Sequence, residues 1–152
     1  FANGAISGAF VHLFNAEMKK YTLGIHTNAS KDGLNPARGH AWISIMDNET
    51  GDFHTYGLFA NQELLMYESD GTGEVRRDFE ILYSKFVTNH FEQITQSQYD
   101  SIAVYLTLDR NSMVWQTNYT CANYAIDIFN IAVGTTYEST RFPANLAKQI
   151  GY

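Results

Sequence analysis

The stretch Trp115–Gly134, WQTNYTCANYAIDIFNIAVG, contains Cys121, the only cysteine among the 152 residues of the chain. A polar run ends at Thr120, and beyond it apolar residues recur at helical spacing on the side of the thiol. Threonine before such a run is a typical N-cap, and Gly134 is a typical helix end. The pattern predicts an amphipathic helix that begins at Cys121 and buries one face.

The position of Cys121 in the first helical turn favours a reactive thiol. The helix dipole stabilises a thiolate at this end, and the amides of the first turn point outward, where they can hold a developing oxyanion. One short element can therefore supply a nucleophile and half of an oxyanion hole. The alternative interpretation is a structural cysteine that packs as a small hydrophobe.

Composition limits the class of protein. A hydrophobic content of 45% and a charged content of 17% indicate a globular chain, and 152 residues suit a single domain. The net charge of -6, without a basic stripe, argues against a nucleic-acid partner. A lone cysteine forms no internal disulfide, and no apolar run reaches membrane-spanning length.

Metal and cofactor motifs are not apparent in the sequence. It contains no HExxH, no paired cysteines, and no two histidines with a carboxylate at ligand spacing. The run SDGTGE, residues 69–74, lacks the Lys-Ser/Thr of a phosphate-binding loop and is predicted to be a turn. We therefore expect neither a metal nor a cofactor.

A β-hairpin is predicted within GHAWISIMDNETGDFHTYGLFAN, residues 39–61. Strand His40–Met46 is dense in apolar residues on both faces, and Asp52–Phe59 is the return strand. A three-residue loop that ends at Gly51 would pair Asn48 with Asp52.

The remaining elements follow from local patterns. Thr95 and Gln98 form a capping-box pattern that predicts a helix over Thr95–Leu108. The other predicted elements are a short strand at Tyr21–Ile25, a loop at Thr27–Arg38, one or two strands within Val75–Phe91, and a terminal helix from Pro143.

A thiolate nucleophile requires a base, and histidine is best suited near neutral pH. His40 opens a hydrophobic strand, where its side chain would stand at the rim of the sheet facing a helix. His54 would lie opposite Met46, about 20 Å from His40 at the usual rise of a strand. His26 and His90 stand in polar surroundings and are predicted to be solvated. His40 is therefore the candidate base, with an inert rim histidine as the alternative.

Two groups of motifs resemble a known family. The opening pattern NGAxxGAFxxxFN resembles the junction after the shell of Rhs-repeat polymorphic toxins, which implies a connector at residues 1–18 and a toxin domain at 19–152. GHAWISI, TYGLF, TxxQYxxI and TNYTC, taken together, resemble the cysteine hydrolase toxins at the ends of Rhs proteins. These are similar to the permuted papain-like enzymes of the NlpC-like and lecithin:retinol acyltransferase-like group.

This resemblance implies an α+β fold, in which an antiparallel sheet is packed by helices and the nucleophile lies at a helix N-terminus. It implies Cys121 as nucleophile and His40 as general base. A third polar group usually orients such a histidine, and Tyr56 is the closest polar side chain on the predicted face. Asn118 or Gln116 would donate to an oxyanion or steady the loop, with ordinary loop capping as the alternative.

The implied function is that of an antibacterial effector toxin, delivered by a secretion system such as type VI into the cytoplasm or periplasm of a target cell. Its implied partners are a cognate immunity protein and a substrate that is a protein or a peptidoglycan peptide. Two alternatives remain open. One is a protein deamidase or transglutaminase-like acyltransferase, and the other is a non-catalytic binding domain that uses the abundant aromatic residues, 14% of the chain.

Overall fold

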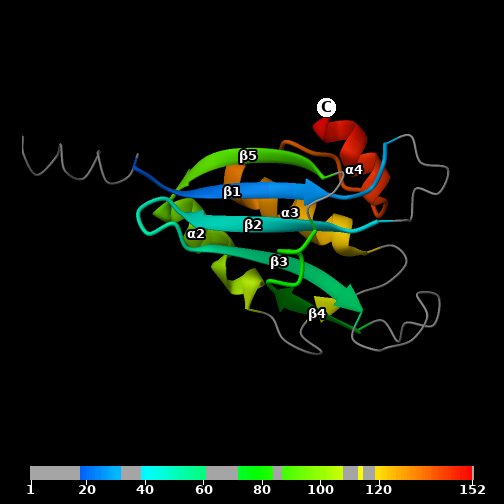
Figure 1. Ribbon diagram of the computed structural model, residues 1–152, viewed down its shortest axis with the longest axis horizontal. Coiled ribbons are helices and arrows are strands. Elements are labelled where there is room, and N and C mark those ends of the chain that lie inside the picture. Colours follow the sequence, from blue (N-terminus) through cyan, green and yellow to red (C-terminus); the bar gives the residue numbers. More distant parts are fainter. Residues whose placement is uncertain are drawn as a thin grey trace, which may run out of the picture.

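The structure, a computed structural model, describes residues 18–31, 39–60, 72–83, 87–107, 113–114 and 119–151. These residues form an α+β domain built on an antiparallel six-stranded sheet with the order β5-β1-β2-β3-β4-β6 (Figure 1). The strands are β1 Lys19–Thr27, β2 Ala41–Asp47, β3 Phe53–Ala60, β4 Thr72–Arg77, β5 Thr88–Thr95 and the short β6 Met113–Val114. The helices are α2 Gln96–Ala103, α3 Cys121–Val133 and α4 Pro143–Ile150.

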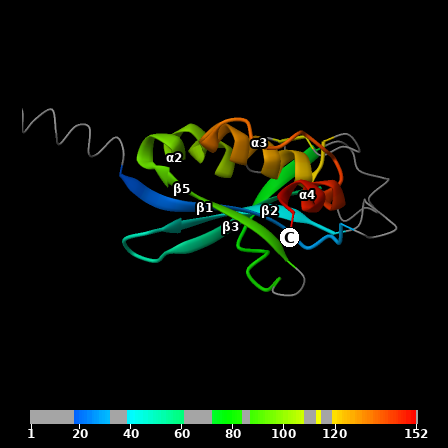
Figure 2. The ribbon, with the colours of Figure 1, turned by 90° about the horizontal axis from the view of Figure 1, so that it is seen from above.

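All three helices cover the same face of the sheet (Figure 2). The core lies between α3 and the central strands, where Ile25, Ile43, Leu58 and Phe129 are almost completely buried. Burying each such side chain contributes about 1.5–3 kcal/mol. The predicted α+β arrangement, an antiparallel sheet packed by helices, is therefore confirmed.

The opposite face of the sheet is crossed by the segment Asp78–Tyr83, which follows β4 (Figure 2). The segment turns Glu80 inward until it is 2% exposed, whereas its apolar neighbours Phe79 and Ile81 remain exposed. We call this side of the sheet the open face. It carries the polar side chains described below.

The predicted hairpin is present as β2 and β3, but its turn differs from the prediction. The amide of Asp47 donates to the carbonyl of Asp52 at 2.8 Å, so the loop comprises Asn48–Gly51 and is one residue longer than expected. The Asp47 carboxylate stabilises this loop because it accepts hydrogen bonds from the amides of Glu49 and Thr50 at 2.8 and 3.0 Å.

The longer loop shifts the pairing of the two strands by one residue. His54 pairs with Ile45 and not with Met46. Because side chains alternate between faces, the shift exchanges the faces expected for every side chain of β3 relative to β2. Phe59 thereby lies beside His40, with 4.7 Å between the ring centroids.

The helix predictions are largely correct. Helix α3 begins at Cys121 with Thr120 as its N-cap and ends at Gly134, whose φ of +88° suits glycine. Thr95 and Gln98 form the predicted capping box of α2, but this helix ends at Ala103 and continues only as a 3₁₀ turn, Val104–Leu106. Helix α4 starts at Pro143 as predicted.

Other predicted boundaries are wrong. Strand β1 extends beyond the expected Tyr21–Ile25 at both ends, so residue 27 belongs to a strand and not to a loop. Residues 72–74 belong to β4 rather than to the expected turn. Residues 1–17 of the expected connector, 32–38 of the expected loop and 69–71 of the expected turn lie outside the described residues.

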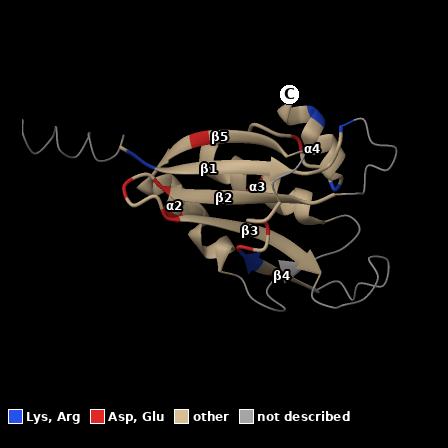
Figure 3. Cartoon of the chain, in the orientation of Figure 1, with Lys and Arg blue, Asp and Glu red and all other residues tan. Residues whose placement is uncertain are grey.

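The charged residues of β1 and β2 lie near the ends of these strands, and β3 contains no Lys, Arg, Asp or Glu (Figure 3). Charged groups near the centre of the sheet therefore arrive from other segments, as Glu80 does. Among the described residues, no helix is sufficiently long and apolar to span a membrane.

Candidate catalytic site

Cys121 is the first residue of α3 and is 8% exposed. The start of this helix is fixed by two bonds of Thr120. Its amide donates to Asn123 Oδ1 at 2.9 Å, and its hydroxyl donates to the Arg141 carbonyl at 2.7 Å. The helix thereby places the thiol near His40, the residue that precedes β2, where Cys121 helps to raise the pKa of the imidazole.

A carboxylate completes the arrangement. His40 Nε2 and Glu80 Oε1 are 2.8 Å apart, and Glu80 Oε2 accepts a hydrogen bond from the Thr55 hydroxyl at 2.8 Å. Both oxygens of the buried carboxylate therefore have partners.

Gly57 provides the space in which the His40–Glu80 pair lies. A Cβ atom at this position would stand 2.0 Å from Glu80 Oε1 and 2.8 Å from His40 Nε2, closer than atoms can approach without a shift. Any larger residue at position 57 must therefore displace the ion pair.

The backbone and ring of His40 are also held in place. Its amide donates to Asn28 Oδ1 at 2.7 Å, and its carbonyl accepts from the Asn28 amide at 3.1 Å. Trp42 stacks on the imidazole with centroids 5.7 Å apart, and Tyr83 meets it edge-on. These contacts give the ring one orientation between the thiol and the carboxylate.

The surroundings of His40 raise its pKa. Burial lowers the pKa, but hydrogen bonds with Cys121 and Glu80, together with their negative charges, outweigh this effect and raise it to about 9. Near neutral pH the imidazole is therefore protonated. A thiolate that lies beside an imidazolium is a competent nucleophile.

A second buried histidine occupies the open face. His26 is 5% exposed, so the prediction that it is solvated is wrong. Its Nδ1 lies 2.5 Å from Asn89 Oδ1 and its Nε2 lies 2.6 Å from Ser44 Oγ. Burial lowers its pKa, against the opposing effects of Asn89 and Glu80. Because Ser44 is itself buried, this Ser-His-Asn arrangement does not present an accessible nucleophile.

The predicted orienting residue is not next to His40. Tyr56 pairs with Ile43 and packs against the core on the helix side, where burial raises its pKa. Glu80 occupies the orienting position instead, and the sequence analysis missed it. Its one sequence signal is a lone carboxylate in the apolar run FEILY, residues 79–83. The two other predicted residues, Asn118 and Gln116, lie outside the described residues.

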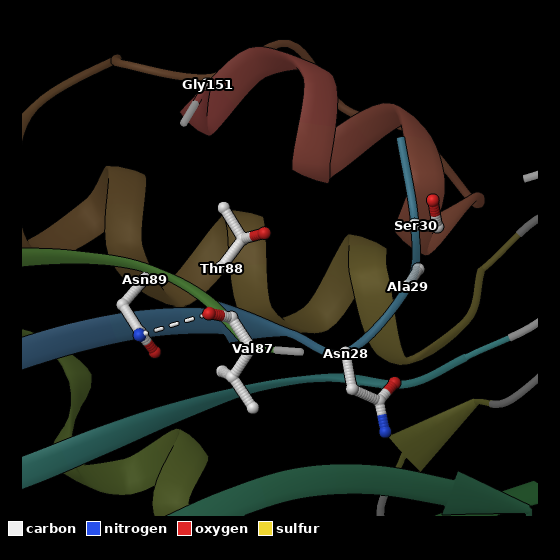
Figure 4. A pocket seen from close by; sticks show the side chains of 7 residues that line it. All are labelled: Asn28, Ala29, Ser30, Val87, Thr88, Asn89 and Gly151. Carbon is white, nitrogen blue, oxygen red and sulfur yellow. Dashed lines mark hydrogen bonds between the residues drawn. The ribbon is translucent and has the colours of Figure 1, made fainter. Parts of the chain in front are cut away.

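A cavity of about 560 Å³ lies among residues at the end of β1, the start of β5 and the C-terminal segment, and its described lining does not include Cys121, His40 or Glu80 (Figure 4). Asn28, which holds the His40 backbone, is at its edge, and Asn89, which contacts His26, lies on another wall. The described lining is Asn28, Ala29, Ser30, Val87, Thr88, Asn89 and Gly151. These described residues are uncharged.

Within the described ranges, no group of three or more His, Cys, Asp or Glu side chains is placed to hold a metal ion. Comparison of the chain with protein-family models, with curated proteins and with solved structures finds no match. The functional interpretation therefore depends on the geometry of Cys121, His40 and Glu80.

Proposed function

We propose that this domain is a cysteine-dependent hydrolase that cleaves an amide or peptide bond through a thioester on Cys121. The observation that carries the proposal is the thiol–imidazole–carboxylate line, in which the pKa of His40 is raised to about 9. The class of enzyme follows from these three groups and does not depend on the permuted papain-like (NlpC-like) topology, which we propose on the sequence resemblance.

The proposed reaction has two steps. The Cys121 thiolate attacks the carbonyl carbon, and His40 gives its proton to the departing nitrogen, so that the amine leaves and a thioester remains. Neutral His40 then takes a proton from water, whose oxygen attacks the thioester, and the carboxylic acid leaves as the thiolate re-forms. Glu80 stabilises the imidazolium and keeps the ring oriented throughout.

The oxyanion of each step would be stabilised at the start of α3. The first amides of a helix have no partner within the helix, and the dipole favours negative charge there. A carbonyl carbon bonded to Sγ of Cys121 places its oxygen near these donors. Asn118 and Gln116 are further proposed donors from the preceding segment.

An apolar surface on the segment that carries Glu80 supports the proposal that the substrate is a polypeptide. Ile81 and Tyr83 are exposed on the segment that carries Glu80, and Leu82 is 87% exposed. Tyr83 joins this apolar surface to the His40 ring. A protein or a peptidoglycan peptide can place apolar side chains here while its backbone reaches the thiol.

The particular enzyme we propose is the C-terminal antibacterial toxin of an Rhs protein. The opening pattern NGAxxGAFxxxFN and the four motifs from GHAWISI to TNYTC support this assignment. The toxin would reach the cytoplasm or periplasm of a target cell through a secretion system such as type VI. A cognate immunity protein would neutralise it.

Growth of bacteria that express the chain tests the proposal. Wild type, Cys121→Ala and His40→Ala are expressed in the cytoplasm and, with a leader peptide, in the periplasm, with equal levels verified. We expect wild type to stop growth in one compartment and both variants to permit it. Growth arrest that survives Cys121→Ala would contradict the enzyme proposal and favour a binding domain that acts through its aromatic residues.

Mass spectrometry of proteins and peptidoglycan from the arrested cells identifies the reaction. Hydrolysis of a peptide bond creates new termini that are absent with Cys121→Ala. Deamidation leaves the chain intact with a gain of about 1 Da, and acyl transfer adds an amine. Either of the latter results would replace the hydrolase with the alternative that retains the same thioester.

A further inference from the structure

A second pocket, of about 290 Å³, lies along α3 beside the end of the 3₁₀ turn that follows α2. It is lined by Tyr105, Tyr119, Tyr124, Asp127, Ile128, Asn130 and Ile131. Three tyrosines and one carboxylate therefore line a space sized for a small group. Tyrosine rings attract cations through the negative potential of their faces.

Asp127 carries the negative charge of this pocket. Tyr119 donates its hydroxyl hydrogen to Asp127 Oδ2 at 2.8 Å. In the part of the chain that the structure describes, no Lys, Arg or His lies within ion-pair distance of Asp127. A half-buried carboxylate among aromatic rings, with a neutral hydroxyl as its partner, favours a cation from outside.

The other hydrogen-bonding groups of the pocket stabilise the fold. Asn130 donates to the Tyr137 carbonyl at 2.7 Å and accepts from the amides of Thr136 and Tyr137, both at 3.1 Å. Tyr124 donates its hydroxyl hydrogen to the Tyr105 carbonyl at 2.8 Å. The walls are therefore fixed, and Asp127 is the charged group that they surround.

We propose that this pocket binds an alkylammonium group, which a polypeptide would present as a lysine side chain. The ammonium head would approach the Asp127 carboxylate, and the methylene stem would lie against the tyrosines and Ile131. A volume of about 290 Å³ is sufficient for such a group. Binding here does not depend on the chemistry of Cys121.

An NMR titration tests this site on the 152-residue chain in its Cys121→Ala form. The probes are n-butylammonium and n-butanol, which have the same length but differ in charge. We expect n-butylammonium to shift the ring signals of Tyr105 and Tyr119 in a saturable manner, and n-butanol to bind about tenfold more weakly. Asp127→Asn should weaken n-butylammonium binding about tenfold, because it removes the charge and keeps an acceptor for Tyr119.

Asp100→Asn is the matched control, since Asp100 is exposed on α2 and accepts a hydrogen bond from Gln96. This variant removes the same charge and should bind n-butylammonium as wild type does. Equal binding of both probes, or equal weakening in the two variants, would overturn the proposal. So would shifts that affect many residues and do not saturate. Unchanged amide spectra of Asp127→Asn establish that the variant is folded.

Discussion

His26 and His40 lie on the same face of the same sheet and experience similar packing. Each ring stacks on Trp42, with centroids 5.5 Å away for His26 and 5.7 Å for His40. Each also lies over a glycine, Gly24 beneath His26 and Gly57 beneath His40. Both imidazoles are largely removed from water, so burial alone favours the neutral form of each.

The two imidazoles have different hydrogen-bond partners, and their pKa values shift in opposite directions. His26 contacts the neutral side chains of Asn89 and Ser44, and its pKa is lowered. His40 contacts Cys121 and Glu80, and its pKa is raised to about 9. The interactions of His40 with these two partners therefore outweigh the effect of burial on its pKa. We infer that the His40 surroundings are suited to proton transfer, whereas those of His26 are suited to fixing the sheet.

The largest difference between the two histidines should appear in the reactivity of Cys121. We expect His40→Ala to slow alkylation by iodoacetamide roughly 30- to 100-fold at pH 6.5, where an ordinary thiol with a pKa of about 8.5 is about 1% ionised. His26→Ala should change the rate less than about threefold, because His26 does not contact the thiol. The alkylation rates are measured by mass spectrometry. Equal effects of His40→Ala and His26→Ala would contradict the inferred difference between the two histidines.

Changing the charge of the side chain that contacts each imidazole should change the pKa of that imidazole. Glu80→Gln keeps a hydrogen-bond partner but removes the charge, so the pKa of His40 should fall. Asn89→Asp places a carboxylate beside His26 and should raise the pKa of that ring. NMR titration of the imidazole signals measures both. Movement of either pKa in the opposite direction would show that charge does not decide the difference.

Gly24 and Gly57 allow a steric test of the difference between His26 and His40. An added Cβ at position 24 would lie 2.5 Å from His26 Nε2 and 2.5 Å from Ser44 Oγ, and at position 57 it meets the His40–Glu80 pair. We expect Gly24→Ala and Gly57→Ala each to cost about 1–3 kcal/mol in urea unfolding. Alkylation of Cys121 at pH 6.5 should slow in Gly57→Ala alone. Slower alkylation in both variants would show that the alkylation rate follows the overall stability of the fold.

The smallest effect concerns stability against pH. The folded pKa of His40 exceeds its unfolded value of 6.5, so its contribution is present below pH 6.5 and is lost as pH rises through about 9. The folded pKa of His26 is below 6.5, so its contribution is present above pH 6.5 and is lost as pH falls. His40→Gln and His26→Gln should change the pH dependence of the free energy of unfolding in opposite directions. Urea unfolding between pH 5 and 9 measures both, and slopes of the same sign would contradict the assignment.

Local patterns were sufficient to predict the helices and the existence of the hairpin. The boundaries of α3 follow from Thr120, from the apolar spacing and from Gly134, which all act within a few residues. The structure also brings Cys121 and His40 together, as the motifs led us to expect. The catalytic roles of these residues stay predictions.

The third member of the site was not predictable in the same way. A register error of one residue assigned Tyr56 to the face of His40, because each step along a strand changes the face. Glu80 reaches His40 from a segment that crosses the open face, and this path depends on packing between distant parts of the chain. His26 appeared solvated because its neighbours in sequence are polar, whereas Trp42 and Phe91 cover it in space.

The position of Trp42 between the two imidazoles has an optical consequence. An indole transfers an electron from its excited state to a protonated imidazole more readily than to a neutral one, so its emission depends on the charge of the ring stacked against it. With His40 charged and His26 neutral near pH 7, the fluorescence of Trp42 should brighten as His40 loses its proton in alkali. The fluorescence of Trp42 should therefore report the protonation state of His40, on which the proposed chemistry depends.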